Sequence, residues 1–494
     1  MTTLDGTSQQ HDLGGGFKIS APGVIGDAVL QPPAAGTTRR SGGTAIDSLL
    51  VGYELDDVAE IDLEITQLAL ASASRGGDEI VIEAPDLGPT VGQVMLSVDP
   101  ATGLLSWHVP EGDVVRGTAT RGGTQRFVLG SESLAAGAPS GTRGMLGWIG
   151  KKLLRVLVYP VTDKITGWIV DQGLSAWEAR ARPHGVRAFG PGAHRSKDWN
   201  ALDVPAWQSL SADRALLFVH GTFSTGAGAF GALPDDIMAA LSIRYSGRIA
   251  AFEHPTLSAT PTENADWLAK LLEAASTNLD VDIVCHSRGG LVSRVLAERI
   301  AGASSRLKVG KVILVGVPNG GTPLADPQHM TDLLDQMTNL ASGTLGAAAS
   351  VGVFATGQAG DIIEAVLAVV KVLGRGLLVG ASGLQSMDPK GALVRSLNEV
   401  AVDTSRYFAV CSDHEPSGTS VSALALRAFD AGMDRVFESA ANDCVVPTIG
   451  MHTADKFVIA PERRVELLKA DGVLHTRYFG STSVGPRLLD LLQG

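Results

Sequence analysis

Apolar and polar positions follow different patterns in successive parts of this 494-residue chain. Residues 1–40 are rich in Gly, Ser, Thr and Pro, which predicts a mobile tail. Between residues 41 and 140 apolar and polar residues alternate, most strictly in Ile61-Asp62-Leu63-Glu64-Ile65. This period of two is typical of half-buried strands. Short strands at regular spacing predict a small β-sandwich in the N-terminal part of the chain.

Residues 141–205 have a different apolar pattern. Leu153, Leu154, Val156 and Leu157 have helical spacing, and a second apolar group spans 165–170. We expect one or two amphipathic helices here, forming a connecting segment that packs against the next domain.

From residue 206 to 494 the pattern predicts strands that alternate with helices. Thr260, Pro261 and Glu263 mark the start of one helix, since threonine caps helices, proline suits the first turn and glutamate completes a capping box. Alternation of this kind predicts an α/β fold with a mostly parallel, doubly wound sheet. Residues 323–398 form a helix-rich insertion between two of the strands. The predicted strands are 215–219, 249–252, 281–284, 312–317 and 407–410.

Composition and charge narrow the class of protein. A hydrophobic content of 45% indicates a globular chain, and its length suggests two or three domains. The net charge of −12 argues against a nucleic-acid partner, because phosphates would be repelled. Three cysteines without Cys-x-x-Cys spacing favour a reducing compartment, and no basic region followed by an apolar run begins the chain. We therefore expect a cytoplasmic protein.

The longest apolar stretch, residues 361–383, contains four charged residues. Because so many charges are costly in lipid, we expect no transmembrane segment, and an amphipathic helix or a buried flap fits this stretch better.

Residues 281–291 indicate most about the function of the chain. In this segment a run of β-branched residues leads into a turn of small residues and then into a helical pattern. Ser287 lies at the apex of this turn. A strand, a sharp turn and a helix in this order predict a nucleophile elbow, which exposes a serine hydroxyl. Gly289 is the second glycine of the usual Gly-x-Ser-x-Gly pattern, whereas Cys285 replaces the first.

A serine nucleophile needs a base, a carboxylate that orients the base, and donors for the oxyanion. His475, near the end of the chain, is the candidate base. The carboxylate is either Asp443, in Asn-Asp-Cys-Val-Val-Pro, or Asp413, nearer the end of the fifth predicted strand; sequence context favours Asp443.

The main-chain amides of Thr222 and Arg288 are the candidate oxyanion donors. His220 and Gly221 precede Thr222 directly after a buried strand, and we expect the ring of His220 to bond the loop backbone. The side chain of Arg288 either steers anionic substrates or lies on the surface.

Residues 210–494 resemble an α/β-hydrolase of the bacterial lipase and esterase type. The resemblance includes the elbow, the Asn-Asp-x-Val-Val-Pro loop, and the order Ser287, Asp443, His475. It also includes residues 317–324, which resemble the segment that enters the lid of such lipases, and residues 387–398, which resemble the segment that leaves it. The resemblance implies a helical lid that binds acyl or alkyl groups and offers a peripheral contact to membranes.

We predict a serine hydrolase that cleaves carboxylic esters through Ser287, His475 and Asp443, with no metal or organic cofactor. The substrate is a small-molecule or lipid-like ester. Acyl transfer, thioester cleavage and amide cleavage use the same machinery and remain alternatives, as does a binding or scaffold protein on a hydrolase fold. The sequence does not define the acyl chain length or the oligomeric state.

Overall fold

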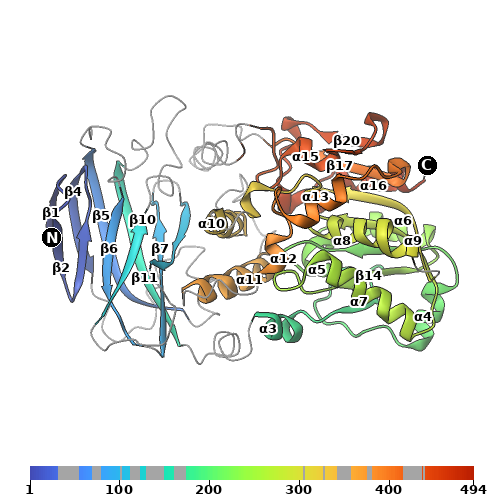
Figure 1. Cartoon of the computed structure of the whole chain (residues 1–494), viewed down its shortest axis with the longest axis horizontal. Coiled ribbons are helices and arrows are strands. Elements are labelled where there is room, and N and C mark those ends of the chain that lie inside the picture. The colour runs from blue at the N-terminus through green and yellow to red at the C-terminus, as the bar shows by residue number, and fades with distance from the viewer. Residues whose placement is uncertain are drawn as a thin grey trace.

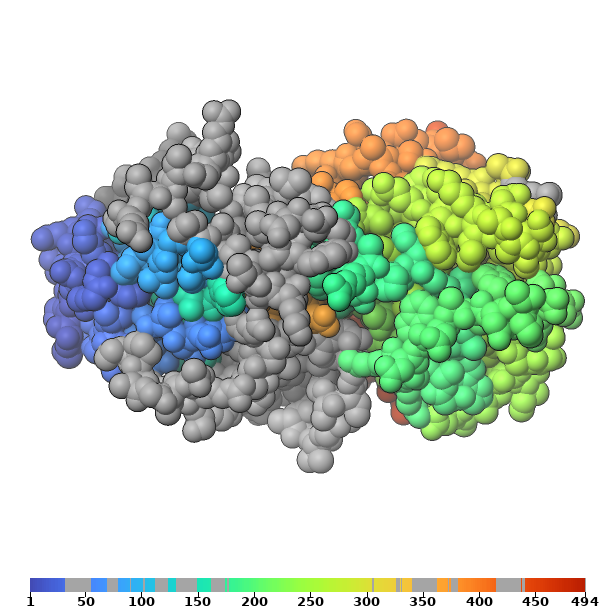
Figure 2. Space-filling view, turned by 90° about the horizontal axis from the view of Figure 1, so that it is seen from below, coloured from blue at the N-terminus to red at the C-terminus, as the bar shows by residue number. Residues whose placement is uncertain are grey.

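A computed structural model describes most of the chain. It covers residues 1–31, 55–68, 79–88, 90–100, 103–111, 123–129, 149–160, 174–303, 306–325, 329–341, 358–374, 381–414, 437 and 440–493. The molecule is elongated, with N-terminal strands at one end and an α/β domain at the other (Figures 1 and 2).

Two antiparallel sheets form the N-terminal part, here called the β domain. Their orders are β1-β4-β5-β11-β7-β8 and β2-β3-β6-β10-β9. In β5 the residues Ala59, Ile61, Leu63 and Ile65 are buried, because alternate side chains point into the core between the sheets. The strands are β1 (Thr2–Asp5), β2 (Gln10–Gly14), β3 (Phe17–Ser20), β4 (Val24–Gln31), β5 (Asp56–Leu68), β6 (Ile80–Pro85), β7 (Val91–Val98), β8 (Leu105–His108), β9 (Pro110–Glu111), β10 (Thr124–Leu129) and β11 (Gly150–Pro160).

Two predictions for this half of the chain are wrong. Residues 2–31 are not a tail but four strands, and side chains such as Leu4 and Ile19 contribute to the buried core. Between them lie polar residues and tight turns, whose composition suggested a mobile segment.

The segment 150–160 is strand β11 rather than a helix. Its apolar residues mimic helical spacing for two reasons: the strand is buried on both faces, and its register shifts between Val156 and Leu157. The second predicted helical group, 165–170, lies outside the described residues.

The α/β domain has a seven-stranded sheet in the order β12-β14-β13-β15-β16-β17-β20, parallel except for β12. The five predicted strands and the capping box at Thr260 are confirmed. However, the domain begins before residue 206, because β12 pairs with β14. The strands are β12 (Gly185–Ala188), β13 (Ala215–Val219), β14 (Ile249–Glu253), β15 (Leu279–His286), β16 (Leu307–Val315), β17 (Tyr407–Ser412) and β20 (Arg464–Leu467).

Helices cover both faces of this sheet. Residues of α7 and α8 pack on one face and residues of α6 and α16 on the other. The π-helical turn Leu296–Ile300 and α9 (Ala301–Ala303) continue α8. The helices of this domain are α3 (Leu174–Ala181), α4 (Val204–Ser211), α5 (Gly226–Phe230), α6 (Asp235–Arg244), α7 (Pro261–Ala274), α8 (Gly289–Val295), α15 (Thr448–His452) and α16 (Val484–Gln493).

The order of the strands reverses between β13 and β15, since β14 follows β13 on one side and β15 lies on its other side. Ligands of open α/β sheets bind at such a switch point, beyond the carboxyl ends of the strands. This is where the chain places both His220-Gly221-Thr222, after β13, and Ser287, after β15.

Between β16 and β17 the chain forms α10 (Met330–Ala341), α11 (Gln358–Leu373), α12 (Ser382–Gln385) and α13 (Ala392–Asn398). Helices α10 and α11, here called the inserted helices, lie between the β domain and the α/β domain (Figure 1). Between residues 362 and 370 of α11 every apolar side chain is buried, and the single charged residue, Glu364, is half-buried. This part of the helix therefore does not present its apolar surface to solvent. In the part of the chain that the structure describes, no helix is both long and apolar enough to cross a membrane.

Candidate active site

Ser287 lies at a sharp turn between β15 and α8. Its φ of 52° is in the left-handed region, which non-glycine residues adopt only where the surrounding structure enforces it. A Cβ on Gly289 would collide with the carbonyl oxygens of Val219 and His220, and a Cβ on Gly290 would collide with Val317. The start of α8 therefore packs closely against the end of β13 and the segment after β16, and both positions require glycine.

Cys285 occupies the place of the missing glycine. Its side chain is fully buried, and its thiol donates to the carbonyl of Ile313 at 3.4 Å. Burial raises the pKa of this thiol to about 12, so Cys285 stays protonated near neutrality. It fills space under the turn and is a poor nucleophile.

The loop after β13 packs directly against Ser287. A Cβ on Gly221 would lie 2.6 Å from the Cβ of Ser287 and 3.2 Å from its Oγ, so this position requires glycine. Thr222 lines the same pocket as Ser287, and Arg288 is the N-cap residue of α8. Amide groups at a helix N-terminus favour negative charge.

The side chain of Arg288 does not match either expectation. It is fully buried and donates to the carbonyls of Gly383 (2.9 Å) and Ala259. It therefore neither lies on the surface nor lines the pocket; it joins the loop before α7 to α12. Burial lowers its pKa to about 10, which leaves it charged near neutrality.

His220 stabilises the loop that follows β13. Its Nδ1 lies 3.1 Å from the carbonyl oxygen of Gly221, and its Nε2 accepts from the amide of His254 at 3.3 Å. Because burial lowers the pKa of His220, its ring is neutral and can donate and accept in this way. The ring thus bonds the loop backbone, as expected from the sequence.

Asp443 and His475 form a buried pair. Nδ1 of His475 lies 2.8 Å from Oδ2 of Asp443, and the two side chains are 3% and 0% exposed. The other carboxylate oxygen accepts from the amides of Val445 (3.1 Å) and Val446 (2.8 Å). Asp443 is therefore held as an acceptor that orients the imidazole.

Asp413 lies elsewhere. It forms an ion pair with Lys469 at 3.5 Å, and both side chains reach solvent. The structure thus brings His475 to Asp443, not to Asp413.

One residue near the pair, Tyr478, had no signal in the sequence. Tyr478 donates its hydroxyl to Oδ2 of Asp443 at 2.9 Å. Burial and the charge of Asp443 raise the pKa of Tyr478 well above its ordinary value, so the hydroxyl remains a donor. Both His475 and Tyr478 belong to one 3-10 helix, His475–Gly480, and this short segment presents the two donors to one oxygen.

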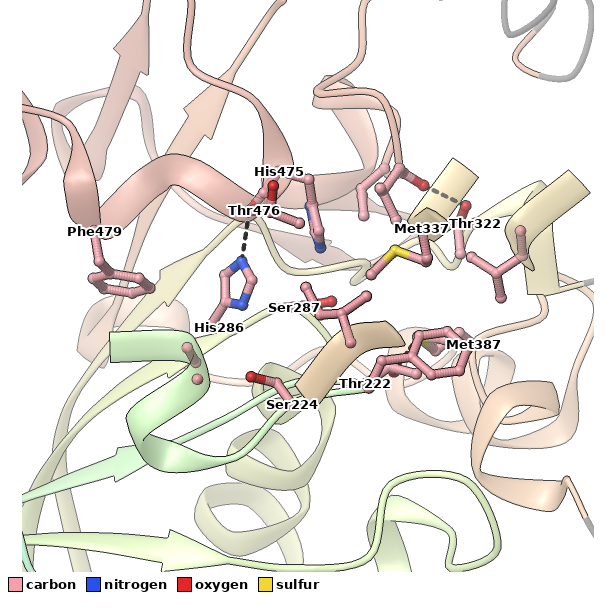
Figure 3. Close-up of a pocket in the computed structure, with 17 residues that line it drawn as sticks. Thr222, Ser224, His286, Ser287, Thr322, Met337, Met387, His475, Thr476 and Phe479 are labelled. Atoms are coloured by element: carbon pink, nitrogen blue, oxygen red, sulfur yellow. Dashed lines mark hydrogen bonds between the residues drawn. The ribbon is translucent and has the colours of Figure 1, made fainter. Parts of the chain in front are cut away.

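His286 directly precedes Ser287 in the chain. The ring lines the pocket, and its Nε2 donates to the main-chain carbonyl of His475 at 2.9 Å (Figure 3). Burial lowers the pKa of His286 to about 3, so the ring is neutral. Its hydrogen bond connects the segment that contains His475 to the turn at Ser287.

The pocket is mainly apolar. Together with its opening to solvent it encloses about 670 Å³. In Figure 3 the imidazole of His475 and the side chain of Ser287 face one another inside it. Among the residues that line it are Phe223, Leu333, Met337, Ile362, Met387, Val445, Val446 and Phe479.

Among the described residues, no group of three or more His, Cys, Asp or Glu side chains is placed to hold a metal ion.

The chain is thus an α/β protein in which a strained serine lies at the switch point of the sheet, in a pocket with a histidine that is bonded to a buried aspartate. The chain belongs to the family described as Domain of unknown function (DUF7379), whose model matches residues 181–493. No protein of curated function matches the chain.

Solved structures with weak similarity include lipase 1 from Pelosinus fermentans, with 14% identity and a TM-score of 0.38 over 57% of this chain and 99% of that one. EstA from Clostridium botulinum has 14% identity and a TM-score of 0.36 over 57% and 86%. Mature lipase BlEst2 from Bacillus licheniformis has 18% identity and a TM-score of 0.30 over 56% and 91%.

Proposed function

We propose that this chain is a serine hydrolase that cleaves carboxylic esters. The observation that carries the proposal is that His475 lines the same pocket as the strained Ser287 and is held from behind by the buried Asp443, 2.8 Å from its Nδ1. A neutral imidazole that donates from Nδ1 to a carboxylate has its Nε2 lone pair available as a base.

In the proposed reaction, Oγ of Ser287 attacks the acyl carbon while Nε2 of His475 accepts its proton. The imidazolium then gives this proton to the leaving alkoxide, and an acyl-enzyme remains. Water attacks the acyl-enzyme, again losing a proton to His475, and releases the acid and free Ser287. The amides of Thr222 and Arg288 stabilise the oxyanion in both steps; one such donor typically contributes ~3 kcal/mol.

The lining of the pocket supports an ester with an apolar acyl group. Its walls are aliphatic, aromatic and thioether side chains, with a few hydroxyls and the two histidines. Apolar walls stabilise an acyl chain by removing it from water.

Hydrolysis of p-nitrophenyl esters by the full-length protein tests the proposal. We expect turnover that disappears in Ser287→Ala. Ser293→Ala is the matched control, since it removes another buried hydroxyl, in α8, and Ser293 does not line the pocket. A folded wild-type protein without esterase activity, or an active Ser287→Ala variant, would overturn it. Product analysis with a thioester, an amide and an alcohol acceptor separates ester hydrolysis from the related reactions.

A further inference from the structure

One sheet of the β domain is buried on both faces at β11, β7 and β8. The inner face packs against the second sheet, with residues such as Met95 and Val156. Side chains of the outer face belong to the same hydrophobic cluster as the inserted helices; they include Val94, Leu96, Leu105, Trp107, Leu157 and Tyr159. The inserted helices are therefore packed against the β domain.

Polar contacts fix α10 on the edge strand β8. Asn339 accepts from the amide of Leu105 at 2.9 Å and donates to its carbonyl at 2.7 Å. Asp335 accepts from the amide of Trp107 at 2.6 Å, and the indole Nε1 donates to Thr338 at 2.9 Å. An edge strand exposes unpaired main-chain groups, and these side chains satisfy them as a neighbouring strand would. Such directional contacts set both the position and the rotation of α10.

The end of α11 is held by β7 and β11. The hydroxyl of Tyr159 donates to the carbonyl of Lys371 at 2.7 Å, and the ammonium group of Lys371 lies 5.4 Å from the centre of the tyrosine ring. A Cβ on Gly374 would lie 2.5 Å from Val94 and 2.7 Å from the hydroxyl of Tyr159. The helix thus ends in close contact with the sheet.

The opposite sides of the same helices form the pocket wall. Leu333 and Met337 of α10 line the pocket, as does Ile362 in the first turns of α11. Leu333 and Met337 are four residues apart and share one face of α10. The anchoring residue Asp335 follows Leu333 by two positions, and Asn339 follows Met337 by two. Two residues correspond to about 200° around a helix, so the anchored face and the pocket face are opposite.

We propose that the β domain sets the width of the acyl-binding pocket by holding α10 and α11. Trp107, Leu105 and Tyr159 are positioning residues for acyl-chain selectivity, although they lie outside the pocket. This inference rests on the proposed function and extends it, since it assigns a role in specificity to the domain that lies outside the matched family region.

The test compares rates of covalent labelling by alkyl fluorophosphonates with short and long chains, using the full-length protein. Asn339→Leu keeps the volume of the side chain but leaves the main-chain groups of Leu105 without this partner. Trp107→Phe is milder and removes the bond to Thr338. We expect the ratio of long-chain to short-chain labelling rates to fall at least about fivefold in Asn339→Leu, and by less in Trp107→Phe, because small displacements of a pocket wall have large effects on reactive geometry. The short-chain rate should change little.

Ile82→Ala is the control. Ile82 is fully buried in the core between the two sheets, so its truncation destabilises the β domain without touching the inserted helices. We expect its labelling ratio to match that of wild type, with circular dichroism confirming that all variants are folded.

Two results overturn the inference: an unchanged ratio in both folded interface variants, or an equal fall in Ile82→Ala. Absence of labelling in the wild-type protein would instead refute the proposed function, and the inference would fall with it.

Discussion

Asp443→Asn is the substitution that separates the two candidate acids most clearly. Oδ1 of Asp443 accepts from two main-chain amides, while Oδ2 faces His475 and Tyr478. An asparagine must place its carbonyl oxygen on the two amides, because an NH2 group there would meet donors. Its NH2 group then faces Nδ1 of His475 and donates to it.

This donor imposes the wrong tautomer on the imidazole. The proton of His475 moves to Nε2, which can no longer accept the proton of Ser287. The equivalent exchange in serine proteases lowers kcat about 10⁴-fold, which corresponds to about 5.5 kcal/mol of transition-state stabilisation. We expect a loss of this size in Asp443→Asn, with little change in KM, because the carboxylate does not line the pocket.

The assay is steady-state hydrolysis of a p-nitrophenyl ester, with Asp413→Asn as the matched control. That change removes a partly exposed ion pair with Lys469, which is worth at most about 1 kcal/mol of stability, and we expect kcat to stay within about twofold of wild type. Equal losses in both variants, or a larger loss in Asp413→Asn, would show that Asp443 is not the carboxylate that orients His475.

Three further predictions follow from contacts around the site. Tyr478→Phe should lower the free energy of unfolding by ~2 kcal/mol, as expected for a lost hydrogen bond to a charged group, and reduce kcat far less than Asp443→Asn; a variant as stable as wild type in urea would contradict this. Gly221→Ala should lower kcat/KM by about 100-fold, since its Cβ would lie 2.6 Å from that of Ser287, and near-normal activity would contradict the close packing. Burial raises the pKa of Asp335 well above 3.8, so the contribution of its protonated carboxyl to stability is fully present below that value and is lost as the pH rises through the folded-state pKa. The stability of Asp335→Asn relative to wild type should therefore increase as the pH rises above about 4. A pH-independent difference in urea denaturation would contradict this direction.

The sequence predicts well those elements whose pattern of apolar, polar or glycine residues depends on neighbouring residues alone. The strands of the α/β sheet are buried on both faces by helices, so they are continuous apolar runs between turn residues, and the elbow at Ser287 has glycines that the close packing requires. The capping box at Thr260 depends on neighbours three residues apart and is equally local.

The errors arise where distant segments decide the structure. The apolar residues of strand β11 have helical spacing because its outer face, too, is buried. The inserted helices, more than 150 residues later in the chain, cover that face. The anchoring of Leu105 by Asn339 joins residues 234 positions apart, and no local pattern marks it. Tyr478 has an ordinary sequence context, and its role depends on which oxygen of Asp443 it reaches.

The role of Ser287 as the nucleophile is tested most directly by locating the residue that an alkyl fluorophosphonate modifies. We expect one adduct, on the peptide that contains Ser287. It should be absent in Ser287→Ala and form much more slowly in His475→Ala. A folded protein that remains unmodified, or an adduct on a different residue, would contradict this role.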